Sequence, residues 1–192
     1  MDSHDYVTYE QWGRNFFALA VTEDRVAAAF GEIAGDELTM GPMAQGPGRL
    51  ARVTAKVRIQ EPRAIRQLGD TITFTIRIPL VIDLLVDLRL DKQRFTVDGE
   101  IALRATARAA EPLVLILDVA KPRATDISVH VESQSIRGEI VRLIGGVDAE
   151  IRRFIAAHVS EQIDAPESIQ AKVIDVASMI DATWTGAGPQ TV

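Results

Sequence analysis

Side chains that could do acid–base, nucleophilic or metal chemistry are few and scattered along this sequence. The three histidines, His4, His130 and His158, are far apart in the chain, and no two have the i, i+4 spacing of a metal-binding helix. No cysteine is present, which excludes disulfides, thiol catalysis and cysteine-ligated metals. We therefore expect each histidine to be solvated or to have a structural hydrogen bond.

Asp83, Asp87 and Asp91 form the densest acidic cluster. On a strand they would share one face, but a four-residue step spans about 13 Å, which is too far for one cation. On a helix they would form a stripe, which is typical of a solvated face. No GxSxG turn occurs, and the segment GPMAQGPG at 41–48 lacks the Lys-Ser/Thr ending of a phosphate-binding loop. We predict no catalytic residue, no bound metal and no cofactor, which favours a protein that is not an enzyme but leaves an enzymatic alternative open.

The composition is that of a globular protein without a nucleic-acid partner. The 192 residues are 47% hydrophobic and 25% charged, and the net charge of −6 opposes binding to a phosphate backbone. The sequence contains no secretory signal pattern and no run of about 20 apolar residues, the length that spans a bilayer. We expect a cytoplasmic protein whose membrane contact, if any, is peripheral.

The dominant pattern is the strict alternation of the segment TITFTIRIPLVIDLLVDLRL at 71–90, where every even position is apolar. A period of two points successive side chains to opposite faces, so the pattern predicts one very long strand. Pro79 has no N–H to donate, which predicts an edge, a bulge or a bend there. The alternative is a helix over 79–91 with Pro79 at its first position, because leucine favours helices.

Shorter alternating runs accompany this long strand. They lie at 51–60, 95–109, 113–119 and 127–131. Short polar connections between successive strands predict an antiparallel meander. We interpret the segments 41–48 and 63–70 as connections, because the first is rich in glycine and proline.

Helical spacing of apolar residues appears at both ends of the chain. Thr8 and Thr22 are predicted N-caps of two short helices. From 135 to 163, apolar residues recur at steps of three and four, which predicts a long amphipathic helix. The segment 167–183 fits a further helix, although Val173 to Val176 could instead pair as a strand.

These elements predict an α+β fold: a long, strongly bent antiparallel sheet wrapped around amphipathic helices, with N-terminal helices and a long C-terminal helix. We expect a single domain over residues 1–184 and a disordered tail over 185–192. The inward positions of the third long strand are small, for example Gly99 and Ala105. Small residues there predict either close packing of a helix or a slot for an apolar ligand.

The order of helices, a meander of very long strands and a long amphipathic helix resembles the tubular lipid-binding (TULIP, SMP/BPI-like) superfamily over residues 9–183. It is similar to bacterial members found in actinomycetes. The resemblance implies a lipid, isoprenoid or polyketide carried in an aliphatic groove between sheet and helix, without catalysis. The residues that would line this groove are Ile72, Phe74, Ile76, Ile78, Leu80, Ile82, Leu103, Ala105, Ala107, Leu115, Leu117, Ile140, Leu143, Ile144, Val147 and Ile151.

Two other functions fit the same patterns. One is an enzyme with a helix-grip cavity, like START and polyketide-cyclase proteins, acting on a hydrophobic substrate. The other is a structural domain with a filled core that forms a homodimer. The outward apolar residues Val81 and Leu85 would then contact a second subunit.

Overall fold

The computed structural model describes residues 5–31, 34–45, 51–88, 91–130 and 138–184, with the side chains of the last segment described from 147 on. Its helices are α1 (Tyr9–Ala20), α2 (Glu23–Ala29), α3 (Gly138–Asp164), α4 (Pro166–Ala171) and α5 (Val176–Trp184). Its strands are β1 (Glu37–Gln45), β2 (Ala51–Ile59), β3 (Arg63–Gln67), β4 (Ile72–Asp87), β5 (Lys92–Ala110), β6 (Val114–Val119), β7 (Ile127–His130) and β8 (Val173–Asp175). The tail predicted at 185–192 lies outside the described residues.

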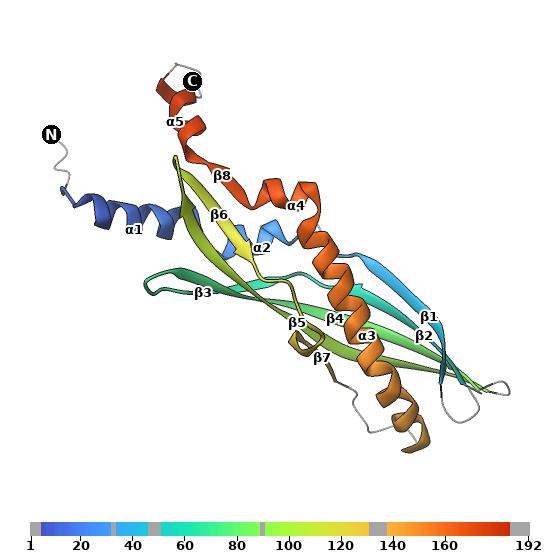
Figure 1. Cartoon of the computed structure of the whole chain (residues 1–192). Helices are drawn as coiled ribbons and strands as arrows, with labels where there is room; N and C mark the ends of the chain where they lie inside the picture. Colours follow the sequence, from blue (N-terminus) through green and yellow to red (C-terminus); the bar gives the residue numbers. More distant parts are fainter. Residues whose placement is uncertain (1–4, 32–33, 46–50, 89–90, 131–137, 185–192) are drawn as a thin grey trace, which may run out of the picture.

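These strands form one strongly curled antiparallel sheet, which confirms the predicted α+β class (Figure 1). The order across the sheet is β1-β2-β4-β5-β6-β8. Strand β3 continues the line of β2 along β4, and β7 lies beside β5 beyond the end of β6. The sheet is therefore a meander in which two of the strands are broken into collinear pieces.

Strand β4 is the centre of the sheet and confirms the strand interpretation of the alternating segment as far as Asp87. Every even residue from Phe74 to Val86 is at most 2% exposed. Pro79 lies where β4 passes from pairing with β3 to pairing with β2. Its carbonyl accepts a hydrogen bond from the Gln60 N–H at 2.9 Å in the β2–β3 connection. The backbone nitrogen and carbonyl oxygen of one strand residue point to the same side of the strand. The Pro79 nitrogen, which carries no hydrogen, therefore faces the β2–β3 connection, where the ladder along β4 is interrupted.

Two segments predicted as connections are strands. Residues 41–45 belong to β1, whose register with β2 shifts between Met40 and Met43. Gly41 lies in this bulge at φ +107, and an added Cβ would be 2.6 Å from the Val53 carbonyl oxygen. The bulge absorbs the Gly-Pro pair, so the strand continues past it. Residues 63–67 form β3, because β4 is longer than β2 and offers unpaired backbone groups beyond it.

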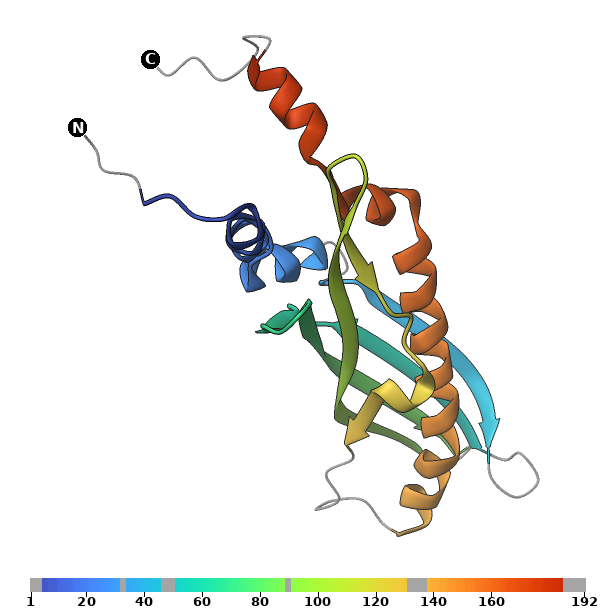
Figure 2. The same ribbon diagram turned by 60° about the vertical axis from the view of Figure 1, so that its left-hand side comes forward.

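Helix α3 runs inside the curl of the sheet as one continuous element (Figure 2). It contacts β1 on one side and both β7 and the 3₁₀ turn before β7 on the other. Its described apolar residues Val147, Ile151 and Ile155 are at most 1% exposed and join the β4 residues in one core. The predicted packing of an amphipathic helix on a bent sheet is thus confirmed. Among the described helices, none is long and apolar enough to cross a bilayer.

The C-terminal segment contains both structures that its pattern allowed. Pro166 begins α4, Val173–Asp175 pair with β6 as β8, and Val176 begins α5. The backbone pairing to β6 interrupts what would otherwise be one helix.

Candidate functional site

Most residues predicted to line a groove between sheet and helix lie in the packed core instead of bordering open space. Those at most 3% exposed are Phe74, Ile76, Ile78, Leu80, Ile82, Leu103, Ala105, Leu115, Val147 and Ile151. Ala107 and Leu117 are 6% exposed. The side chains of Ile140, Leu143 and Ile144 lie outside the described residues. From the predicted set, Ile72, Ala107 and Leu115 border cavities, and these cavities lie at the α1 end of the sheet.

Two adjoining cavities beside α1 form a large hollow, which we call the α1 groove. One, of about 610 Å³, extends from α1 to the β3–β4 turn and the end of β5. The other, of about 380 Å³, lies between α1, the β5–β6 turn and α5. They share Gly13, Phe17 and Ala109 as lining residues, so they are neighbours.

The two halves of the α1 groove differ in polarity. The smaller half is lined only by aliphatic, aromatic and glycine residues, with Trp12 stacked on Phe16 at a centroid distance of 5.5 Å. The larger half is also lined by the charged residues Arg14, Arg108 and Asp70. Each of these cations has a carboxylate partner, Glu10 at 2.7 Å and Asp118 at 2.8 Å respectively. An apolar slot that continues into a charged one suits an amphiphilic molecule.

The C-terminal end of α1 is hydrogen-bonded to the body of the protein. Arg25 donates to the Leu19 and Ala20 carbonyls, and Arg66 on β3 donates to the Ala18 and Val21 carbonyls. These cations satisfy the last carbonyl groups of the helix and favour its negative end. The first turn is capped only by Thr8, whose hydroxyl accepts from the Gln11 N–H.

Sequence reasoning missed the α1 groove because its walls come from three distant segments. In the sequence, Trp12 and Phe16 have helical spacing and Leu113 belongs to the alternating run at 113–119, and neither pattern indicates an exposed side chain. In the structure Trp12 is 58% and Leu113 is 55% exposed. The available signal was composition, since both tryptophans and both tyrosines lie within 12 residues of a chain end.

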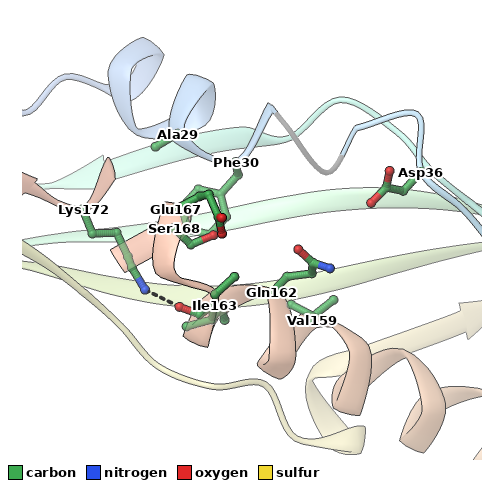
Figure 3. Close-up of a pocket in the computed structure, with 10 residues that line it drawn as sticks. Ala29, Phe30, Asp36, Val159, Gln162, Ile163, Glu167, Ser168 and Lys172 are labelled. Atoms are coloured by element: carbon green, nitrogen blue, oxygen red, sulfur yellow. Dashed lines mark hydrogen bonds between the residues drawn. The ribbon is translucent and has the colours of Figure 1, made fainter. Parts of the chain in front are cut away.

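A smaller cavity of about 230 Å³ lies between α2 and the junction of α3 with α4 (Figure 3). Lys172 borders it and donates to the Ile163 carbonyl at 2.6 Å, which satisfies the C-terminal end of α3. Burial lowers the pKa of Lys172, and Asp164 partly opposes this change. Because this cation already caps a helix and the cavity is small, we assign it a structural role.

The acidic cluster is part of a ladder of ion pairs on the outer face of the sheet. Asp83 accepts from Arg58 at 2.9 Å and from the Thr96 hydroxyl at 2.6 Å, and Asp87 lies 3.5 Å from the Lys92 ammonium. Across the described residues, no group of three or more carboxylate, histidine or cysteine side chains is placed to hold a metal ion. Asp83 and Asp87 therefore have cross-strand partners, and Asp91 accepts from the side-chain amide of Gln93.

His130 and His158 lie on different elements, β7 and α3. His4 lies outside the described residues, and His130 ends β7 opposite Asp98. His158 on α3 has a buried Nε2 without a hydrogen-bond partner among the described residues.

Replacing Thr96 by valine should raise the pKa of Asp83, which the Thr96 hydrogen bond and then Arg58 hold below its ordinary value. A carboxylate with a lowered pKa contributes stability above its unfolded pKa and loses it as pH falls through the folded pKa. The variant should therefore be less stable at neutral pH, by under about 1 kcal/mol because the pair is exposed. The difference should vanish at acid pH. Urea denaturation at both pH values and an NMR titration of Asp83 measure this, with Thr54→Val on β2 as the control.

Comparison with known proteins gives no matching family model and no matching curated protein. Among solved structures, the chain is similar to a lipopolysaccharide binding protein, with 9% sequence identity and a TM-score of 0.41. The similarity covers 81% of this chain and 38% of that protein. The chain thus spans well under half the length of that structure, and the similarity does not place it in a family.

Proposed function

We propose that this chain binds an elongated amphiphile, such as a lipid, in the α1 groove. The observation that carries the proposal is the lining of the groove, which is apolar around Trp12 and Phe16 and charged in the half lined by Arg14, Arg108 and Asp70. Its volumes of about 610 and 380 Å³ lie within the usual range of small-molecule sites, roughly 300–1,000 Å³. The TULIP-like order of elements, a curled sheet around a long helix, agrees with a lipid ligand.

The polarity of the two halves orients the ligand. A hydrocarbon chain gains by leaving water for the apolar half, at about 25 cal/mol per Å² of buried apolar surface. An anionic head group would lie beside Arg14 and Arg108 and would replace Glu10 and Asp118 as the partners of the two guanidinium groups. Exchange costs little, because both ion pairs are more than half exposed and exposed pairs contribute under about 1 kcal/mol.

A structural role is the second candidate, because the interface between α3 and the sheet is packed. Ile76 and Ile78 on β4 and Ile155 on α3 are each fully buried. A domain whose main core is filled in this way needs no ligand to be stable. The two candidates differ in whether the wild-type protein takes up an amphiphile.

Replacing Ala109 by phenylalanine tests the ligand site. Ala109 is exposed and lines both halves of the α1 groove, so the larger side chain should fill the groove without disturbing the core. We expect affinity for a fluorescent fatty acid to fall at least tenfold, which is about 1.4 kcal/mol. The thermal midpoint should not change.

Ala157→Phe is the matched control, because Ala157 is exposed on α3 and lines neither half of the groove. It should bind the fatty acid like the wild type. Equal weakening by both variants would contradict the proposed site. Native mass spectrometry of the wild type should show a bound amphiphile, and failure of the wild type to bind any fatty acid or phospholipid would favour the structural candidate.

A further inference from the structure

Gly13 lies in the middle of α1, at a position where the described residues do not require a glycine. It belongs to a regular helix that runs from Tyr9 to Ala20. A Cβ added to Gly13 would have no heavy atom within 4 Å beyond its chain neighbours and the backbone of its own helix. At Gly41 and Gly99, by contrast, an added Cβ would lie 2.6 and 2.8 Å from backbone oxygen atoms. The chain itself therefore excludes a side chain at those two glycines but not at Gly13.

The glycine also weakens a helix that has little other support. Glycine in a helix interior is less stable than alanine, because it loses more backbone freedom on folding. Helix α1 has 12 residues and no buried one, and isolated helices of about that length are marginal in water. An alanine at Gly13 would fit the space and would stabilise α1. The folding of the chain therefore does not account for this glycine.

Gly13 lies at the boundary between the two halves of the α1 groove. Gly13 and Phe17 are four residues apart, so they form a stripe along one side of α1, and both line both halves of the groove. Trp12 on one side of this stripe lines the smaller half, and Arg14 on the other side lines the larger half. The ring of Phe17 packs against the core and fills its part of the stripe. At Gly13 the stripe has no side chain, and Ala109 of β5 also lines both halves.

We propose that Gly13 is a specificity-determining residue, at which the hydrocarbon chain of a long amphiphile crosses from one half of the α1 groove to the other. The absence of a Cβ lets that chain approach the helix backbone closely. This inference rests on the proposed function and adds the class of ligand, a single chain long enough to occupy both halves. A short chain is accommodated within one half and does not need the crossing at Gly13.

Replacing Gly13 by leucine tests the crossing. Leucine favours helices, so circular dichroism should show that the variant keeps its helix content, and the thermal midpoint should not fall. We expect the affinity for the long-chain acid palmitate to fall at least about tenfold and that for the short-chain acid decanoate to change less than about twofold. Isothermal titration calorimetry with each acid measures both ratios. Gly13→Ala should weaken palmitate binding less than Gly13→Leu, because it adds only one methyl group.

Gln11→Leu is the matched control, because Gln11 is exposed on the same helix and lines neither half of the groove. It should bind both acids like the wild type. Equal weakening of palmitate and decanoate by Gly13→Leu would overturn the crossing, and so would unchanged palmitate binding, while both results would leave the proposed ligand site in place. Failure of the wild type to bind either acid would instead contradict the proposed function, and the crossing with it.

Discussion

Replacing Phe74 by alanine is expected to lower the free energy of unfolding by about 3–5 kcal/mol, the usual cost of deleting a fully buried phenylalanine ring. Phe74 is 1% exposed near the start of β4 and lies opposite Ala105 on β5. Its small neighbour cannot fill the space that the ring leaves, so the variant would keep a cavity. Urea denaturation followed by circular dichroism measures the change, with an unchanged slope m if only stability is affected.

Phe95→Ala is the matched control. Phe95 lies on β5 opposite Leu84 and is only partly buried against the same core. We expect it to cost less than Phe74→Ala, because part of the ring is already in water. If Phe74→Ala cost under about 1 kcal/mol, the region around β4 would be loosely packed. The filled core described above would then be wrong, and the groove predicted between sheet and helix would regain support.

Replacing Gly99 by valine is expected to cost about 3 kcal/mol, at the upper end of the range for overpacking a core. An added Cβ would lie 2.8 Å from the Ser128 carbonyl oxygen and 3.5 Å from side-chain atoms of Ile82 and Leu80. The first contact is with the backbone of β7, which pairs with β5 at this point. Because a backbone oxygen cannot rotate away, β7 would have to separate from β5.

Ala102→Val, three residues further along β5, is the control for Gly99→Val. Ala102 is exposed on the outer face, and valine favours strands, so stability should change by less than about 0.5 kcal/mol. Hydrogen exchange of the β7 amides should increase in Gly99→Val and stay unchanged in Ala102→Val. Equal stability of the two variants would contradict the close approach of β7 to β5 at Gly99.

The long regular elements could be predicted from the sequence because their cause is local. One face of β4 and one face of α3 are buried, and burial imposes the period of the element on the residues that form it. The spacing of Ile76, Ile78 and Leu80 therefore predicts a strand. The spacing of Ile151 and Ile155 predicts a helix. The caps at Thr8 and Thr22 are equally local, since each hydroxyl accepts from an N–H three residues away.

The short strands and the hollow could not be predicted, because their causes lie in distant segments. Gly41-Pro42 would end most strands, and it continues β1 only because β2 is present to pair on both sides of the bulge. Residues 63–67 became a strand because β4 extends beyond β2. Whether the inward positions of the sheet lined a slot or a core depended on how closely α3 approached, and periodicity is the same in both cases.

The sequence by itself thus determined an α+β fold with a bent antiparallel sheet around a long helix, because alternation and helical spacing record which face of each element is buried. Only the tertiary structure decided which buried faces meet and which surfaces remain open. Ile76 and Ile151, which were predicted to line a groove, are buried in the core. A different groove lies beside α1, where Trp12, Ala109 and Leu113 come together from separate segments. The period of a strand or helix specifies the direction of each side chain but not which residues that side chain contacts. A binding site is defined by contacts between side chains of different elements.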